Sequence, residues 1–199
     1  EDIMNWAKNH EIPVVLTGHH HQRATERAKE TLDILSKQGE MYDFILLLQG
    51  DEPQILPDDI KNLSAAFCGS ELEIVNLVYP IDGDDLGNPN VVKAIMSNTS
   101  KISFFTRAHV PNQSNQAMRQ LGMIGFNIAA LTQYTNLQPT PLEELESIDM
   151  MRLLENDYEI NAVISSSPIL GVDHPEDIAK ADLMMAKDLL LETYRHKYL

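Results

Sequence analysis

The sequence is poor in cysteine, in aromatic residues and in positive charge. Its single cysteine, Cys68, has no second cysteine to form an internal disulfide with, which fits a reducing compartment such as the cytoplasm. Lys and Arg number 15 against 30 Asp and Glu. The net charge of −15 argues against nucleic acid as a partner, because phosphate backbones bind clustered cations. No apolar run approaches the ~20 residues that span a bilayer, so no membrane contact is expected.

The chain has 199 residues, 43% of them hydrophobic, which is enough for a substantial core. It shows no internal repeat and no linker that would divide it, so we predict a single α/β domain over residues 1–199. The sequence opens on Glu1 and Asp2 within a helical pattern. We therefore expect the domain to be incomplete at its N-terminus.

Helical and strand-like patterns alternate in the first part of the chain. Apolar spacing predicts helices over residues 2–10, 25–35 and 58–67, and short apolar runs predict strands over residues 14–16, 44–48 and 74–79. Such alternation is typical of βαβ units and of a parallel sheet. The C-terminal part repeats it, with a helix over residues 139–154, a strand over 162–164 and a last helix over 176–198.

The middle of the chain has consecutive strands and few helices. Strands are expected over residues 91–96 and 102–106, a polar irregular stretch over 111–120, and a strand leading into a helix over 123–131. We predict an antiparallel insertion at residues 80–135. The expected fold class is therefore α/β, with a mixed, mainly parallel sheet flanked by helices.

Two carboxylates follow apolar runs that read as strands. The run at residues 44–48 stops at Gln49-Gly50-Asp51-Glu52-Pro53, and a second aspartate stands in Gly171-Val172-Asp173. In open α/β sheets, ligands bind in the crevice beyond the carboxyl ends of the strands. Carboxylates placed there suit a hard cation such as Mg²⁺ and the phosphates that it carries. The pattern favours metal-assisted nucleotide chemistry.

Six short motifs make the pattern more specific. They occupy residues 17–27, 49–53, 88–93, 105–107, 138–143 and 171–178. Gln49-Gly50-Asp51-Glu52-Pro53 matches a Gln-Gly-Asp-Glu-Pro motif. The six motifs and their order along the chain resemble those of the CMP-Kdo synthetases, the cytidylyltransferases that activate 3-deoxy-manno-octulosonate (Kdo). The resemblance implies a fold like that of the nucleotide-diphospho-sugar transferases.

The resemblance also implies an activity and a set of residues. CMP would pass from CTP to a 3-deoxy ulosonic acid, with release of pyrophosphate and with Mg²⁺ as cofactor, as in lipopolysaccharide biosynthesis. Asp51 and Asp173 would be the catalytic metal ligands. The nucleotide would contact Thr25, Arg27 and Gln49, and the sugar acid would contact Arg107, Gln120, Gln138, Asp149 and Arg152. A homodimer formed through residues 80–135 is expected by the same resemblance, which also marks that segment as sugar-binding.

Plainer interpretations compete with these roles. Asp51 could be a turn former or a helix cap, Asp173 a helix cap and Arg107 a surface residue. Lys93 is a weaker candidate than Arg107, and its plainer interpretation is an exposed lysine. Three adjacent histidines, residues 19–21, point in different directions and do not predict a zinc site.

The chain also departs from the family pattern. It has no Arg- and Lys-rich N-terminal loop to grip the triphosphate, and Arg23-Ala24 replaces Ser-Gly. Gln120, Ile124, Phe126 and Met150 replace hydrogen-bonding groups, which predicts a less polar sugar pocket. Two alternatives therefore stay open: a catalytically inactive relative that binds or scaffolds, and a sugar nucleotidyltransferase of other base specificity.

Overall fold

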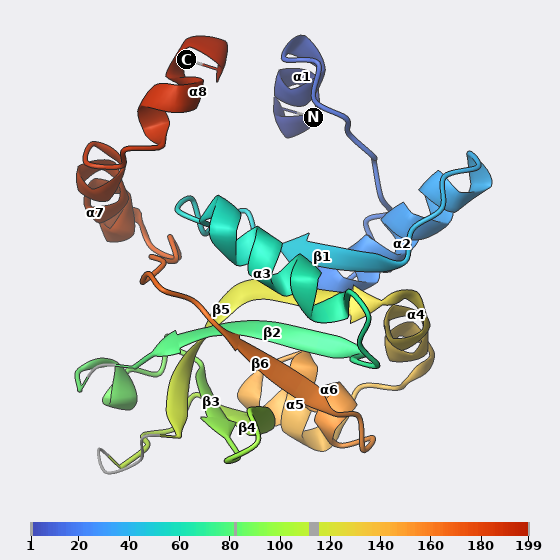
Figure 1. Ribbon diagram of the computed structural model, residues 1–199, viewed down its shortest axis with the longest axis vertical. Coiled ribbons are helices and arrows are strands. Elements are labelled where there is room, and N and C mark those ends of the chain that lie inside the picture. The colour runs from blue at the N-terminus through green and yellow to red at the C-terminus, as the bar shows by residue number, and fades with distance from the viewer. Residues whose placement is uncertain (1, 82, 112–115, 199) are drawn as a thin grey trace.

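The computed structural model describes residues 2–81, 83–111 and 116–198. Its centre is a six-stranded sheet in the order β1-β5-β2-β6-β4-β3, in which β3 also pairs with β5. This extra pairing closes β5, β2, β6, β4 and β3 into a ring, with β1 added outside β5 (Figure 1). The strands are β1 (Phe44–Leu48), β2 (Ile74–Pro80), β3 (Lys93–Met96), β4 (Lys101–Thr106), β5 (Ala117–Asn127) and β6 (Ile160–Ile164).

The prediction of a mainly parallel sheet is wrong. Only β2 and β6 pair in parallel among the described strands, and the other pairings are antiparallel. The reason is the position of β5. Strands β1 and β2 run in the same direction, joined by the crossover helix α3 (Pro57–Phe67), but β5 lies between them in the opposite direction.

The segment 80–135 contributes β3, β4 and β5 to this same sheet. Residues 117–120, expected to be irregular, begin β5, because they pair with both β2 and β3. Residues 112–115 of the same polar stretch lie outside the described residues. The strand expected at residues 14–16 is an extended segment without a ladder partner.

The helices are α1 (Asp2–Asn9), α2 (Ala24–Lys37), α3, α4 (Ile128–Asn136), α5 (Pro141–Glu146), α6 (Met150–Leu154), α7 (Pro175–Met185) and α8 (Leu191–Tyr198), with a 3₁₀ turn η1 (Asp85–Gly87). The single helix expected over residues 139–154 is split into α5 and α6, because Ser147 adopts a left-handed conformation, φ 54°. The last predicted helix is likewise divided into α7 and α8. No helix in the described part of the chain is long and apolar enough to cross a bilayer.

The core lies on both faces of the sheet. Helix α3 covers one face, where Leu63 packs with Val75 and Leu77 of β2. On the other face, Ile74 and Val78 of the same strand pack with residues of α4, α5 and α6. This alternation places β2 at the buried centre of the molecule. Helices α1, α7 and α8 stand away from this body (Figure 1).

A bulge interrupts the pairing of β2 with β5. Asn76 lies opposite Ile124, but Val78 lies opposite Gln120, so residues 121–123 of β5 face the single residue Leu77. The buried Asn76 side chain fills the irregularity. Its Nδ2 donates to the carbonyls of Leu77 and Leu121 at 3.0 Å each and to that of Met123 at 3.2 Å. The bulge is therefore satisfied by one amide.

The crossing of β1, β5 and β2 generates a stability prediction at Gly125. A Cβ there would lie 2.6 Å from Phe67 Cε2 and 2.8 Å from Val75 Cγ2. Gly125→Ala should lower the free energy of unfolding by about 1–3 kcal/mol through overpacking, measured by urea denaturation. Gly83→Ala is the control, because a Cβ at that position meets nothing within 4 Å. Equal urea midpoints for the two variants would contradict the packing described.

Candidate active site

A cavity of about 510 Å³ lies at the carboxyl end of β1. Its walls come from the loop after β1, the start of α2, the loop before β3, the middle of β5, the α5–α6 junction and the segment before α7. Charged side chains of both signs line it: Arg23, Asp51, Glu52, Arg107, Arg119, Asp149 and Asp173.

The loop after β1 is fixed to the bulge of β5. The Gln49 N–H donates to the Gly122 carbonyl at 3.0 Å, and the Gly122 N–H donates to Glu52 Oε1 at 2.7 Å. A Cβ on Gly122 would lie 3.0 Å from Glu52 Cδ and 3.1 Å from Gln49 Cβ. Any larger residue here would have to displace the Glu52 side chain, so glycine allows the close approach that holds this loop, with Asp51, at the cavity.

Asp51 and Asp173 line the same cavity, as the sequence predicts. The two segments are joined directly, since the Val172 N–H donates to the Asp51 carbonyl at 2.9 Å. Both residues are exposed. Neither aspartate caps the helix that follows it, because the N-cap residues are Leu56 for α3 and His174 for α7. Asp51 does lie in the turn after β1, as its plainer interpretation predicts.

Glu52 is a cavity residue that the sequence analysis missed. Its Oε2 atom is buried and has no hydrogen-bond partner among the described residues. Burial raises the pKa of the Glu52 carboxyl to about 7, against the opposing effect of the Gly122 N–H, and the nearby Asp51 charge raises it further. The matching Gln-Gly-Asp-Glu-Pro motif was the available signal, but it drew attention only to the aspartate.

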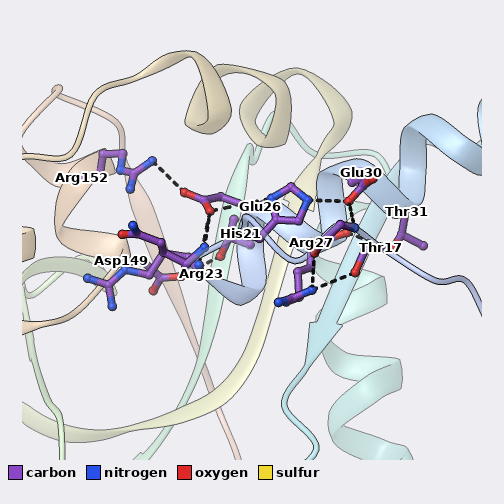
Figure 2. A network of polar contacts seen from close by, with 12 residues as sticks. Thr17, His21, Arg23, Glu26, Arg27, Glu30, Thr31, Asp149 and Arg152 are labelled. Atoms are coloured by element: carbon purple, nitrogen blue, oxygen red, sulfur yellow. Dashed lines mark hydrogen bonds and ion pairs between the residues drawn. The ribbon is translucent and has the colours of Figure 1, made fainter. Parts of the chain in front are cut away.

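Of the three residues expected to contact the nucleotide, the structure places only one on the cavity wall. Gln49 lines the cavity, whereas Thr25 is fully buried and donates to Asp149 Oδ2 at 2.7 Å. Arg27 points to the loop before α2, where its Nη1 donates to Thr17 Oγ1 at 3.0 Å and to the Gly18 carbonyl at 2.9 Å (Figure 2). Thr25 thus supports the cavity wall at Asp149, Arg27 holds the loop at residues 17–18, and neither residue lines the cavity.

Two residues assigned to the sugar acid are also absent from the cavity wall. Gln138 is exposed after α4, and Arg152 is buried in a two-bond ion pair, with Nε and Nη2 each 2.7 Å from a carboxylate oxygen of Glu143. The Arg152 guanidinium also stacks 4.4 Å from the ring centroid of Tyr134. Arg152 therefore fixes α6 to α5.

The same ion pair extends to the start of α2. Arg23 Nε lies 3.3 Å from Glu143 Oε1, and Arg152 Nη1 lies 3.8 Å from Glu26 Oε1. Figure 2 shows Arg23, Glu26 and Arg152 converging from α2 and α6. Arg23, which replaces a family serine, is thereby held at the cavity wall. The sequence analysis noted this replacement without assigning the arginine a role.

Arg107, Gln120 and Asp149 do line the cavity. Arg107 is held by backbone carbonyls, since its Nε donates to Glu146 O at 3.0 Å and its Nη1 to Pro89 O at 3.2 Å. Arg119, which was not singled out, lines the cavity as well and pairs with Asp85 at 3.2 Å.

The prediction of a less polar sugar pocket is wrong for three of its four residues. Ile124, Phe126 and Met150 are buried in the core, each no more than 1% exposed. The apolar replacements therefore lie beneath the sheet surface and say little about the ligand. Only Gln120 of that set faces the cavity.

The plainer interpretation of Lys93 as an exposed residue is wrong, because its side chain is fully buried. Its Nζ donates to the carbonyls of Asn88, Val91 and Arg107, each at 2.9 Å. Burial lowers the pKa of this ammonium group. The lysine ties the loop before β3 to the end of β4, two segments that both reach the cavity.

Of the three consecutive histidines, His21 pairs with a glutamate of α2 and holds the loop before that helix. His21 Nε2 lies 2.5 Å from Glu30 Oε2, which also accepts the Gly18 N–H at 2.8 Å. Among the residues described, no group of three or more His, Cys, Asp or Glu side chains is placed to hold a metal. A metal bound at Asp51 and Asp173 would need further ligands from water or substrate.

Asp149 gives a pH-dependent prediction. Burial raises its pKa although Thr25 donates to it. At pH values above the ordinary aspartate pKa of about 3.9, the folded state binds more protons than the unfolded state. The stability contributed by Asp149 therefore falls as pH rises toward the raised pKa. The stability of wild type relative to Asp149→Asn should decline over that window in urea titrations. Asp43→Asn, at an exposed position, is the control, and parallel pH profiles for wild type and Asp149→Asn would contradict the assignment.

Lys93 gives a second prediction. Lys93→Met keeps the length of the side chain but leaves three carbonyls without their donor, which should cost about 1–3 kcal/mol of unfolding free energy. The matched control is Lys101→Met, which removes a half-exposed lysine paired with Glu159 at 2.5 Å and should cost less than about 1 kcal/mol. Equal losses in the two variants, measured by urea denaturation, would show that Lys93 is not a clamp.

The chain matches known proteins over most of its length. A family model described as cytidylyltransferase matches residues 1–161. The 3-deoxy-manno-octulosonate cytidylyltransferase of Parabacteroides distasonis is 32% identical over 188 residues, covering 87% of this chain and 74% of the relative. The enzyme of the same name from Chloroherpeton thalassium is 32% identical over 199 residues, covering 94% of this chain and 78% of the relative.

The fold has a solved counterpart. A CMP:2-keto-3-deoxy-manno-octonic acid synthetase, solved in complex with CTP, superposes with a TM-score of 0.83 at 23% identity. The match covers 94% of this chain and 78% of that one. It shows the same α/β arrangement, a mixed sheet with flanking helices, as in nucleotidyltransferases. On the family match and the extent of identity, the chain belongs to the 3-deoxy-manno-octulosonate cytidylyltransferase family.

Proposed function

We propose that this protein transfers CMP from CTP to a 3-deoxy ulosonic acid, Kdo or a close relative of it, and releases pyrophosphate. One observation carries the proposal: Asp51 and Asp173, joined through the Val172 N–H, converge on a single cavity. Arg23, Arg107 and Arg119 on the other walls provide cations for anionic groups. The names of the relatives support CTP and Kdo as the substrates.

The reaction makes a definite demand on these residues. The attacking oxygen of the sugar acid forms a bond to the α-phosphorus of CTP, the bond to the bridging oxygen of pyrophosphate breaks, and the hydroxyl proton is lost. Catalysis requires the two oxygens to be held in line and the developing charge to be neutralised. A cavity with carboxylates on one wall and arginines on the others can orient both substrates.

Magnesium fits the donor set at Asp51 and Asp173. Mg²⁺ prefers hard oxygen ligands and is usually bound by one or two carboxylates together with water and phosphate oxygens. Two exposed carboxylates on one cavity, joined by a backbone hydrogen bond, match that requirement. When bound, the ion would supply charge neutralisation at the triphosphate and acidify the attacking hydroxyl. Asp51 and Asp173 would hold it.

The sugar acid would lie toward Arg107, Gln120 and Asp149. Arg107 is pre-oriented by the carbonyls of Glu146 and Pro89, which suits it to pair with a carboxylate. Asp149, held by Thr25, can accept hydrogen bonds from hydroxyl groups when it is ionised. A homodimer formed through residues 80–135 and a cytoplasmic location remain predictions of the same family resemblance.

Asp51→Asn tests this function directly. Loss of one metal ligand should lower Mg²⁺-dependent pyrophosphate release from CTP and Kdo by at least about 100-fold, equivalent to about 2.7 kcal/mol of transition-state stabilisation. Asp58→Asn, on the exposed first turn of α3, is the matched control and should keep wild-type activity. Circular dichroism should be unchanged in both variants.

Three outcomes separate the alternatives. Activity of Asp51→Asn within about tenfold of wild type would contradict the metal-ligand role. Binding of Kdo without turnover in the wild type would favour an inactive, scaffolding relative. Turnover with another nucleoside triphosphate in preference to CTP would favour a different base specificity.

A further inference from the structure

The buried amide of Asn76 has only one possible orientation. One terminal atom of its side chain contacts three backbone carbonyls, those of Leu77, Leu121 and Met123. Carbonyl oxygens only accept hydrogen bonds, so that atom must be the nitrogen. The other terminal atom is therefore the oxygen, Oδ1. The three carbonyls therefore fix the orientation of the Asn76 amide.

This orientation determines that of Gln120. The Gln120 side chain lies 2.7 Å from Asn76 Oδ1, which can only accept, so Gln120 must present its Nε2 there. Gln120 also lines the cavity. Its Oε1 accepts no hydrogen bond from any residue in the described part of the chain. Gln120 Oε1 is thus an acceptor without a donor partner in the described part of the chain, and the contact of Gln120 Nε2 with Asn76 fixes its position.

We propose that Asn76 is a positioning residue that holds Gln120 with its amide oxygen available to the substrate, so that this wall selects sugar acids with a hydrogen-bond donor opposite Gln120. The inference rests on the proposed function and adds the polarity of one contact to it. A hydroxyl or an ammonium group can donate to Oε1, whereas a methylene, a methyl or an ether oxygen at that place would leave it unpaired.

The contact discriminates through the cost of an unpaired polar atom. A bound sugar acid that lacks the donor would displace water from Gln120 Oε1 and leave it unpaired, and that loss is larger than the gain from a matched pair. Free rotation would let a glutamine present its nitrogen instead and accommodate either partner. The bulge removes this freedom, because flipping Gln120 would place two oxygens against each other at Asn76.

Substrate competition tests the proposal. The ratio of kcat/KM for Kdo to that for analogues that each lack one hydroxyl is measured with CTP and Mg²⁺. Wild type should disfavour one analogue by about tenfold, and Gln120→Leu should bring that ratio close to one while the ratios for the other analogues stay unchanged. Gln120→His should retain the discrimination, because an imidazole that donates to Asn76 still presents an acceptor nitrogen. Gln133→Leu, at an exposed position on α4, is the control.

An unchanged ratio in Gln120→Leu, or an equal loss for Kdo and every analogue, would overturn the inference while leaving the transferase function standing. Absence of pyrophosphate release by the wild type with CTP and all of the acids would overturn the proposed function and the inference with it. A second measurement needs no variant. In protein labelled with ¹⁵N-glutamine, the Gln120 side-chain amide should exchange more slowly than that of Gln133, and equal exchange rates would contradict the positioning by Asn76.

Discussion

The bulge at residues 121–123 of β5 is the constraint on which the cavity depends. Four polar backbone groups of the bulge have side-chain or backbone partners that shape the cavity. The Gly122 N–H donates to Glu52, the Gly122 carbonyl accepts from Gln49, and the carbonyls of Leu121 and Met123 accept from Asn76. Backbone groups in a buried sheet must be satisfied, so the irregularity itself holds the loop after β1, where we propose that the metal binds, and orients Gln120.

A second constraint fixes the opposite wall. The buried pair of Arg152 and Glu143 joins α5 to α6, and its link to Arg23 brings the start of α2 against them. Breaking such a pair by removing one partner leaves an uncompensated buried charge, typically a loss of about 3–5 kcal/mol. The arrangement explains how an acidic protein keeps arginines at a cavity that also carries four carboxylates: backbone carbonyls and buried carboxylates hold the cations in place.

The local sequence pattern predicted most of the helices and strands, but it did not predict which strands lie next to each other in the sheet. The strand at residues 44–48 and the carboxylates at Asp51 and Asp173 follow from apolar runs that end in polar turns, and the structure places both aspartates on one cavity. Sequence alone did not reveal that β5 runs antiparallel between β1 and β2, because strand order depends on long-range packing. The same limit hid the burial of Lys93, since three carbonyls from separate segments satisfy it.

The central claim is that Asp51 and Asp173 together hold the metal–nucleotide complex. Titration with Mn²⁺ in the presence of CTP, followed by NMR line broadening, tests it directly, because a paramagnetic ion broadens signals only from nearby residues. The account predicts selective broadening of residues 49–52 and 171–173, lost when Mg²⁺ is added in excess. Broadening centred on the histidines at residues 19–21, or on no defined segment, would contradict it.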